Sequence, residues 1–446
     1  MQGARGRLIE DLGDGLIVRH ITPADSDELC RFNAEIQADP GMPPEEEISV
    51  WTHDLIHNPP PTFTIDDFTV VEDTRTGRIV STLNLISQTW SYAGIPFGVG
   101  QVEIVSTHPD YRRRGLVRRQ FEIAHRWSAD RGQLVQVVSG IPWYYRQFGY
   151  EMCVTHGGGR IGFLPHVPPL DAASEEPFRV RPARPDDAAL IEQIAGHAAS
   201  RYLLSCVRDE AQWRYEIAGH SERSLIRREL RIIESASGTP VGFLAHAFML
   251  VGWLLIAGPY ELQPGVSWTA VTPSVLRYLA ATGEAFAQRT QGARFQGFRL
   301  SLESEHPAYD AIPTRLPSQS RIGAWYMRVP DLARFLRHIA PVLERRLAES
   351  GACGYSGDLR LNFYRSGLRL RFDAGRLSAI EPWPDHDFRG ASASFPDLTF
   401  LQVLFGYRTL EELEHAFADC SVPNEEGRVL LRILFPRQAS FVWQVS

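Results

Sequence analysis

The chain repeats one strand-and-helix pattern, and this repeat constrains its fold more than any other feature. Residues 16–29 read LIVRHITPADSDEL, and residues 178–190 read FRVRPARPDDAAL. In both segments an apolar strand runs into a Pro-Asp pair, which is typical of a helix start because Asp can accept hydrogen bonds from free amides of the first turn. Farther on, residues 68–87 and 230–250 share a strand–turn–strand layout. Two copies of one α/β unit are the simplest explanation.

The segments outside the two copies indicate a linker and a third domain. Residues 164–177 are rich in proline and acidic residues, and we interpret them as the linker. Near residue 324 the pattern changes to an amphipathic helix at residues 329–350, alternating strands, a further helix and a final apolar strand at residues 428–435. This order is typical of a small α+β domain.

The expected fold class is therefore α/β (α+β), with two mixed-sheet domains of one kind and a small C-terminal α+β domain. The length of 446 residues fits three domains of roughly 150 residues each. A hydrophobic content of 44% is typical of a globular protein. We expect the domains at residues 1–165, 178–323 and 324–446.

All 46 basic residues are arginine, and this excludes several kinds of enzyme. A chain without lysine cannot form a Schiff base with pyridoxal phosphate, and it cannot supply the lysine of a P-loop or of a kinase. The net charge of -7 gives the chain no overall basic field, so we expect no nucleic-acid partner.

The cysteines and the apolar runs predict a cytoplasmic protein with no membrane span. The five cysteines lie far apart without a CxxC pair, which favours a reducing compartment and argues against a structural metal or a disulfide framework. The first residues lack the apolar core of a signal peptide. The apolar run at residues 241–258 contains a histidine and internal glycines, so it predicts two buried strands rather than a membrane helix.

The sharpest motif follows the apolar strand at residues 102–107. The sequence HPDYRRRGL places Arg112, Arg113, Arg114 and Gly115 directly before an amphipathic helix. The free amides and the positive end of such a helix form a natural seat for a pyrophosphate. Gly115 allows the backbone to approach a phosphate closely, and the arginines add positive charge. The alternative is an exposed basic helix start that binds nothing.

This motif resembles the acetyl-CoA-binding signature of the GNAT acetyltransferase superfamily, Arg/Gln-x-x-Gly-x-Gly/Ala. Arg112 and Gly115 match the signature, whereas Val117 departs from its final small residue. The segment WYYRQFGYE resembles the YxxFGY element of the same superfamily, with Tyr145 as its first tyrosine. Two such units, of which only the first keeps the signature, followed by a small domain, resemble the enhanced intracellular survival (Eis) acetyltransferases. The third domain of that family is similar to sterol-carrier proteins.

The resemblance implies an N-acetyltransferase that takes acetyl-CoA as acyl donor and needs no metal. The implied acceptor is a primary amine, either of a small molecule such as an aminoglycoside-like compound or a polyamine, or of a protein or peptide. A homo-oligomer, with a hexamer as the expected assembly, is also implied. The residues expected at acetyl-CoA are Val105, Ser106 and Thr107 along the pantetheine arm, Arg113, Arg114, Gly115, Leu116, Val117 and Arg118 at the pyrophosphate, and Gly140 and Ile141 beside the thioester.

Tyr145 and two carboxylates are the candidate catalytic groups. By resemblance, Tyr145 is the general acid that protonates the departing thiolate, and a phenol with a pKa of about 10 is protonated at neutral pH. Its alternative role is packing, because other aromatic residues surround it in the sequence. For the general base, the resemblance favours the C-terminal carboxylate of Ser446, although three residues extend beyond the family-like ending FPRQASFVW. The alternative base is Glu103, which shares a strand face with Val105.

Acidic and aromatic residues near residue 50 are candidates for binding the acceptor. Glu47 and Trp51 lie in PPEEEISVW, at the position of the variable substrate loop in GNAT folds. A cationic amine is attracted by acids and aromatic faces, while the alternative is a solvated charged surface. The second copy has no glycine and only one arginine at residues 270–280, so we expect no phosphate seat there. The alternative function is a ligand-binding protein that uses its third domain and carries a vestigial transferase.

Overall fold

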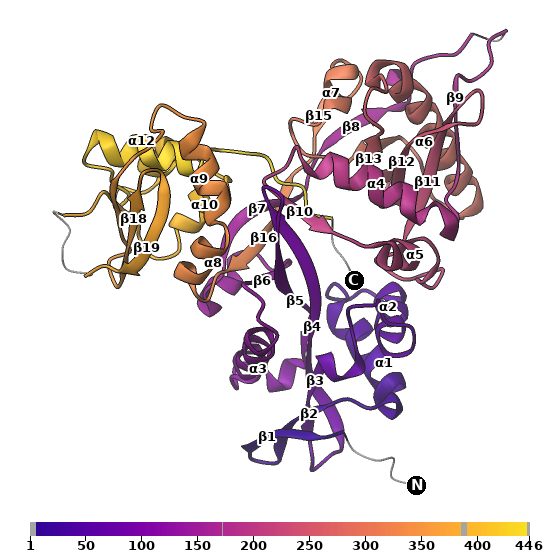
Figure 1. Ribbon diagram of the computed structural model, residues 1–446. Helices are drawn as coiled ribbons and strands as arrows, with labels where there is room; N and C mark the ends of the chain where they lie inside the picture. The colour runs from indigo at the N-terminus through magenta and orange to yellow at the C-terminus, as the bar shows by residue number, and fades with distance from the viewer. Residues whose placement is uncertain (1–5, 172, 385–389, 444–446) are drawn as a thin grey trace.

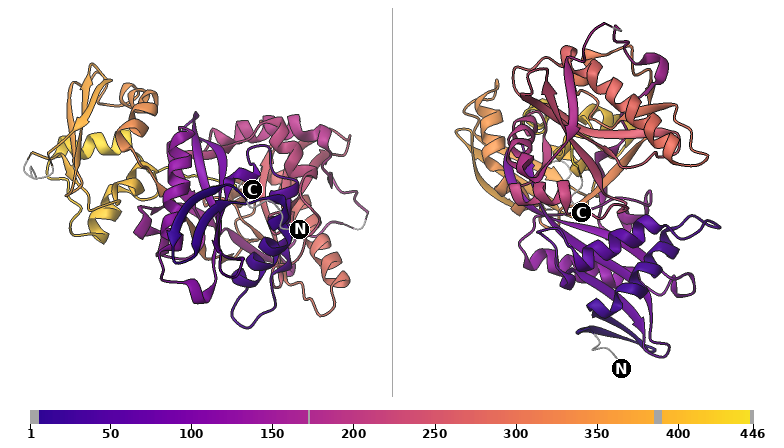
Figure 2. Two further views of the ribbon diagram at one scale, coloured as in Figure 1. Left: turned by 90° about the horizontal axis from the view of Figure 1, so that it is seen from below. Right: turned by 90° about the vertical axis from the view of Figure 1, so that its right-hand side faces the viewer.

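The computed structural model describes residues 6–171, 173–384 and 390–443. It contains three β-sheets with helices packed on them, and the three units meet near the middle of the molecule (Figure 1). The third unit, coloured orange to yellow, projects to one side of the other two (Figure 2).

The first unit is built on a nine-stranded sheet. Its elements are β1 (Leu8–Gly13), β2 (Leu16–His20), α1 (Ser26–Gln37), α2 (Glu46–His57), β3 (Phe68–Asp73), β4 (Arg78–Tyr92), β5 (Ile95–Thr107), α3 (Leu116–Asp130), β6 (Val135–Val138), β7 (Glu151–Gly157), β10 (Leu204–Val207) and β16 (Ile322–Arg328). The strand order is β1-β2-β3-β4-β5-β6-β16-β7, and β10 pairs with β4. Helices α1 and α2 pack on one face, over Phe68 and Ile86, while α3 packs on the other, over Leu83 and Leu85.

The second unit repeats this arrangement on a seven-stranded sheet. Its elements are β8 (Arg160–Phe163), β9 (Phe178–Pro182), α4 (Ala188–Ala199), α5 (Glu210–Ala218), β11 (Arg228–Ser235), β12 (Pro240–Ala247), β13 (Leu254–Leu262), α6 (Trp268–Arg289), β14 (Gly297–Leu300), α7 (Pro307–Ala311) and β15 (Ser318–Gln319). The order is β15-β8-β14-β13-β12-β11-β9, so β9-β11-β12-β13-β14 correspond to β2-β3-β4-β5-β6. Helices α4 and α5 cover one face and α6 covers the other, as α1, α2 and α3 do in the first unit.

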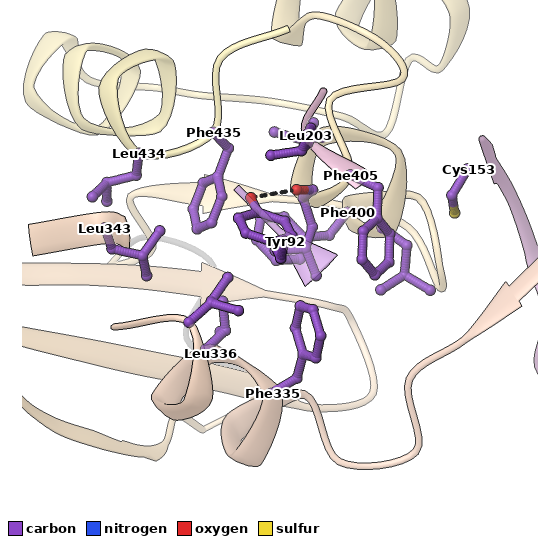
Figure 3. Packing of buried hydrophobic residues seen from close by; sticks show 14 of the residues in the cluster. Tyr92, Cys153, Leu203, Phe335, Leu336, Leu343, Phe400, Phe405, Leu434 and Phe435 are labelled. Carbon is purple, nitrogen blue, oxygen red and sulfur yellow. Dashed lines mark hydrogen bonds between the residues drawn. The ribbon is translucent and has the colours of Figure 1, made fainter. Parts of the chain in front are cut away.

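The third unit is a four-stranded sheet with helices, and its core is continuous with that of the first. Its elements are α8 (Leu332–His338), α9 (Ala340–Ala348), β17 (Gly357–Asn362), β18 (Gly367–Asp373), β19 (Arg376–Pro382), β20 (Ala393–Ser394), α10 (Phe400–Leu404), α11 (Leu410–Ala416) and α12 (Glu425–Leu434). Tyr92, from the end of β4, lies among Phe335, Phe405 and Leu203 (Figure 3). Its hydroxyl donates to the carbonyl oxygen of Leu404 at 2.8 Å. This apolar contact fixes the third unit to the first sheet.

The sheets do not follow the expected domain boundaries, because strands cross between units. Strand β8 lies within residues 1–165 but pairs with β14 of the second sheet. Strand β16 spans the expected boundary at 323–324 and pairs with β6 and β7, and β10 pairs with β4. Each crossing strand satisfies backbone groups that would otherwise lie open at a sheet edge. A sequence pattern identifies a strand but not its partner, so these crossings could not be predicted.

Two expected elements of the third unit differ in the structure. The final strand expected at residues 428–435 is wrong, since these residues lie mostly in helix α12. Its buried residues Gly427, Leu430, Leu431 and Leu434 recur at helical spacing, whereas a strand would alternate. The single helix expected at residues 329–350 is divided into α8 and α9, with Pro341 in the first turn of α9.

The apolar run at residues 241–258 forms β12 and the start of β13, as predicted. Both strands lie inside the second sheet, where helices cover the two faces. Within the described part of the chain, no helix combines the length and the apolar character needed to cross a bilayer.

Candidate active site

Strands β5 and β6 are paired along only part of their length. Their parallel ladder runs from Val99 to Gln101 on β5, opposite Val135 to Val137, whereas β5 continues to Thr107. A bulge interrupts the pairing of β5 with β4 just beyond Glu103, and Ile104 has a φ of 47° there. The last part of β5, from Val102 to Thr107, is therefore not paired with β6, and the bulge bends it.

The three residues expected along the pantetheine arm form this end of β5. Ser106 is buried, and Val105 and Thr107 are half-buried. Gln37 from α1 donates from Nε2 to the carbonyl oxygen of Val105 at 3.1 Å and to Ser106 Oγ at 2.9 Å. A ligand amide that bonds to the Val105 carbonyl would therefore share or displace Gln37. Sequence reasoning missed Gln37, because only the tertiary fold brings α1 against β5.

The turn after β5 leads into α3 as the motif predicted. Gly115 precedes the helix with a φ of 78°, in the left-handed region that favours glycine. The first helical hydrogen bond runs from the amide of Arg119 to the carbonyl of Gly115. The amides of Leu116, Val117 and Arg118 therefore have no partner within the helix, and they lie at its positive end. These amides are suited to an anion.

The arginines around this turn are exposed. Arg113 has a φ of 63° and makes no side-chain hydrogen bond or ion pair with any residue in the described ranges. Arg114 lies over the ring of Tyr111 and donates to the Asp110 carbonyl at 3.3 Å, while Arg118 donates to Gln147 at 3.2 Å. The turn thus combines free amides with an uncommitted guanidinium, which fits the pyrophosphate of acetyl-CoA.

Tyr145 lies just beyond the end of β6, in a short helical turn at residues 144–148. Only 4% of the residue is exposed, and its ring packs against Phe121, Tyr144 and Tyr326. A Cβ atom placed on Gly140 would lie 3.4 Å from the Tyr145 hydroxyl, so the hydroxyl faces the Gly140 backbone. Burial, reinforced by the negative charge of Glu103, raises the pKa of Tyr145 above its ordinary value. The phenol therefore keeps its proton at neutral pH.

Gly140 and Ile141, expected beside the thioester, line the approach to this hydroxyl. Gly140 is exposed with a φ of 119°, and Ile141 is 58% exposed. Their exposure leaves room for a ligand next to the buried phenol. Tyr326, whose hydroxyl accepts a hydrogen bond from the Trp143 amide at 2.8 Å, belongs to β16. No sequence signal linked it to this site, since β16 comes from far along the chain.

Glu103 lies at the bulge, half-buried, and its pKa is raised from 4.5 to about 7. Burial causes the rise, and a hydrogen bond from Gln101 Nε2 to Glu103 Oε1 at 2.6 Å opposes it. A carboxyl with a pKa of about 7 can accept a proton at neutral pH, as a general base must. Its charge also reaches Tyr145, so the candidate acid and the candidate base Glu103 lie in one site.

A chain of buried hydrogen bonds orients Gln101. The indole of Trp90 can only donate, and it donates to Gln88 Oε1 at 2.9 Å. Gln88 Nε2 consequently donates to Gln101 Oε1, which leaves Gln101 Nε2 to donate to Glu103. The i, i+2 spacing of Gln101 and Glu103 on one strand face was a visible signal for this pair. Sequence reasoning did not use it.

Ser446, the other candidate base, lies outside the described residues. Residues 439–443 run beside β10 in the same direction, since the amide of Leu203 donates to Ala439 and that of Phe441 donates to Leu204. Strand β10 runs antiparallel to β4, so residues 439–443 advance along β4 in the direction of Asn84, the residue that pairs with Glu103. The choice between Ser446 and Glu103 stays open.

Glu47 and Trp51, the expected acceptor-binding residues, lie on helix α2 rather than on a loop. Trp51 is 5% exposed and packs in the core between α1, α2 and the sheet. Glu47 is ion-paired with Arg223, and its carbonyl accepts from the Leu225 amide. Their periodic apolar neighbours favour a helix, and Glu47 holds α2 against the second unit. Neither offers a free surface to an amine.

The stretch compared in the second copy, residues 270–280, lies inside α6, whereas the turn before α6 contains Gly265 with a φ of 82° and no arginine. The single arginine of residues 270–280, Arg277, is ion-paired with Glu176 at 2.5 Å and bonded to the Pro168 carbonyl. The guanidinium therefore fixes the linker to the helix. The missing arginines agree with the lost signature of the second copy, whereas the turn itself keeps a glycine.

Comparisons with known proteins agree with this geometry. Residues 18–153 match the model of the acetyltransferase (GNAT) domain. No curated protein sequence matches the chain. A GCN5-related N-acetyltransferase from Kribbella flavida is similar over 97% of this chain and 98% of its own, with 17% identity and a TM-score of 0.63.

Two further solved structures extend the likeness. A GCN5-related N-acetyltransferase from Anabaena variabilis is similar over 96% of this chain and 99% of its own, at 11% identity and a TM-score of 0.63. Eis1 from Mycobacterium abscessus is similar over 96% of this chain and 99% of its own, at 14% identity and a TM-score of 0.56. At these identities the likeness shows the fold. Residues 18–153 thus match a GNAT acetyltransferase domain, and nearly the whole length of the chain has the fold of the GCN5-related N-acetyltransferases and of Eis1.

Proposed function

We propose that the first domain transfers an acetyl group from acetyl-CoA directly to a primary amine. One observation carries the proposal: Glu103 on β5 and Tyr145 after β6 both lie beyond the point where the ladder between these two strands ends, and the Tyr145 hydroxyl faces the exposed Gly140 backbone. A base with a pKa of about 7 beside a phenol that keeps its proton is the pairing that aminolysis of a thioester needs.

The residues expected to hold acetyl-CoA fit that ligand. Free amides of Leu116 to Arg118 and the uncommitted Arg113 would bind the pyrophosphate. Val105 to Thr107 would bind the pantetheine arm, and Gly140 and Ile141 would flank the thioester. Bound acetyl-CoA supplies an acetyl group activated as a thioester. The chain's contribution is to hold the amine and the thioester together.

The proposed step uses one base and one acid. Glu103 takes a proton from the amine while the bond between its nitrogen and the acetyl carbon forms. Tyr145 gives its proton to the sulfur while the carbon–sulfur bond breaks, and it regains a proton as Glu103 loses one to solvent. With the Ser446 carboxylate as base, the same bonds form and break.

Binding of acetyl-CoA to the α3 seat is tested by calorimetry on the full chain. We expect Arg113→Ala and Arg114→Ala each to weaken binding about fivefold, since one exposed ionic contact contributes roughly 1 kcal/mol. Arg126→Ala is the matched control, because Arg126 is an exposed arginine farther along the same helix. Equal affinity of all three variants and the wild type would exclude the pyrophosphate assignment.

The acceptor is tested by thiol release with a panel of amines. Aminoglycosides, polyamines and peptides with free amino groups cover the proposed classes. An amine-dependent release of coenzyme A supports the transferase. Binding of acetyl-CoA without release for any amine would favour the vestigial-transferase alternative. A homo-oligomer, a hexamer by resemblance, and a cytoplasmic location complete the proposal, and light scattering measures the assembly.

A further inference from the structure

A cavity of about 890 Å³ is lined by residues of all three units. The end of β7 lines it from the first unit, and residues 405–408 line it from the third. Strands β8 and β14 of the second unit and residues 437–443 complete the wall. Its volume suits a small organic molecule. Among the described residues, neither those proposed above for acetyl-CoA nor Glu103 and Tyr145 line it.

Three arginines of the second unit line this cavity without an ion pair to any described carboxylate, and the first of them, Arg160, lies over the ring of Tyr309. Arg228, at the start of β11, donates to the backbone carbonyls of Leu225 and Arg227. Arg299, on β14, donates to the hydroxyls of Ser301 and Ser320 at 3.0 and 3.2 Å. Across residues 6–171, 173–384 and 390–443, neither of these two guanidinium groups forms an ion pair.

The surroundings of the Arg228 and Arg299 guanidinium groups disfavour their positive charge. Burial lowers the pKa of both, and the charge of Arg299 lowers that of Arg228 further. Glu216 opposes this effect on Arg228, but Glu216 is itself bound by Arg208 and His220. Two half-buried cations close together cost free energy unless an anion joins them.

Within the described ranges, none of the acidic residues on the cavity wall forms an ion pair with Arg228 or Arg299. Glu412 is ion-paired with Arg437 at 3.0 Å. Glu303 accepts from the hydroxyl of Ser304 and from the amide of Glu305. His156, also on the wall, has its pKa lowered by burial and by Arg228, so it is neutral at pH 7. Glu303 and Glu305 lie on the same wall, but among the described residues no carboxylate forms an ion pair with Arg228 or Arg299.

The cavity lies where the second unit has the same break in strand pairing that β5 and β6 have in the first unit. The corresponding strands β13 and β14 pair only as far as Ala257 and Leu300. Gly258 and Ser301, the residues that follow, line the cavity. Glu103 lies beside this break in the first unit, whereas Arg228 and Arg299 line the cavity beside the break in the second unit. The second unit is therefore suited to bind an anion at this place.

We propose that this cavity binds a small organic anion, whose carboxylate or phosphate group pairs with Arg228 and Arg299. Arginine binds both groups through paired N–H donors. Ile226, Ile256 and Phe441 line the same cavity and offer apolar surface to the rest of the ligand. This site is separate from the α3 seat, and the proposal does not depend on the transferase activity.

The test is calorimetry of the full chain with phenyl phosphate and phenylacetate, and with benzyl alcohol as the neutral control. We expect at least one of the anions to bind and benzyl alcohol not to bind. Whichever anion binds more tightly identifies the head group. Arg228→Gln and Arg299→Gln should each weaken that binding at least tenfold, while Arg113→Ala/Arg114→Ala should leave it unchanged. Failure of both anions to bind would overturn the proposal.

Two further results would also overturn it. One is binding that survives in both glutamine variants or that is lost in Arg113→Ala/Arg114→Ala, since the anion would then sit elsewhere. The other concerns stability without ligand. Because Arg299→Gln removes a cation that forms no ion pair within the described part of the chain, we expect an unchanged or higher melting temperature, and a lower one would mean that Arg299 serves the fold.

Discussion

Removing the hydrogen bond from Gln101 should make Glu103 a weaker acid. Gln101 Nε2 donates to Glu103 at 2.6 Å, and this bond opposes the rise of the Glu103 pKa to about 7. A hydrogen bond to a charged group contributes about 1.5–3 kcal/mol. Since about 1.4 kcal/mol corresponds to one pKa unit, Gln101→Met should raise the pKa of Glu103 by about one to two units. Methionine keeps the length of the side chain and removes only its donor and acceptor.

The assay is kcat/KM for thiol release against pH, with saturating acetyl-CoA and one amine. With Glu103 as base, the wild-type rate rises with pH as the carboxyl ionises, and Gln101→Met moves that rise to higher pH by the same one to two units. Using one amine for both proteins cancels the ionisation of the amine itself. Gln133→Met is the control, because Gln133 is also buried but bonds to Ser87.

An unmoved rise in Gln101→Met would refute Glu103 as the base. If removal of Ser446 then abolished turnover while acetyl-CoA still bound, the C-terminal carboxylate would be the base. A loss of kcat at every pH, with no change in the profile, would instead show that Gln101 only supports the local structure.

Other substitutions test the same site. Glu103→Gln should raise the free energy of unfolding by up to about 3 kcal/mol at pH 8 and leave it unchanged at pH 4, which urea denaturation measures. The folded-state pKa of Glu103, about 7, exceeds its ordinary value of 4.5, so the stability of the wild type falls as the pH rises between these two values, and glutamine removes that loss. Tyr145→Phe should lower kcat at least about 100-fold with unchanged acetyl-CoA affinity, while Tyr144→Phe has little effect; equal turnover in both would assign Tyr145 to packing. Gly115→Ala should cost about 1–2 kcal/mol by thermal unfolding and weaken acetyl-CoA binding, because its φ of 78° disfavours a side chain; an unchanged melting temperature would contradict this.

The predictable parts of the fold are those encoded in short segments. The repeated strand and Pro-Asp helix start identified the two related units, and RRRG identified the turn before α3, because each depends on neighbouring residues. The apolar run at residues 241–258 was also local enough to interpret as strands. By contrast, β16 pairs with β6 and β7 across about half the chain, and no pattern in residues 322–328 specifies those partners.

The chemistry of the site depends even more on distant contacts. Glu103 was visible as a carboxylate, but its raised pKa arises from burial that only the assembled sheet creates. Trp51 shows the opposite case, because an aromatic residue beside acids suggested a binding surface and the fold placed it in a core. The role of Gln37 at the Val105 carbonyl had no sequence signal at all.

The crossing strands bear on how such a chain can change during evolution. A gene segment ending at residue 165 would keep β8 without β14 and would lack β10 and β16, leaving β6 and β7 without the strand between them. The first unit could therefore not be recombined with another gene at the apparent linker and still complete its sheet.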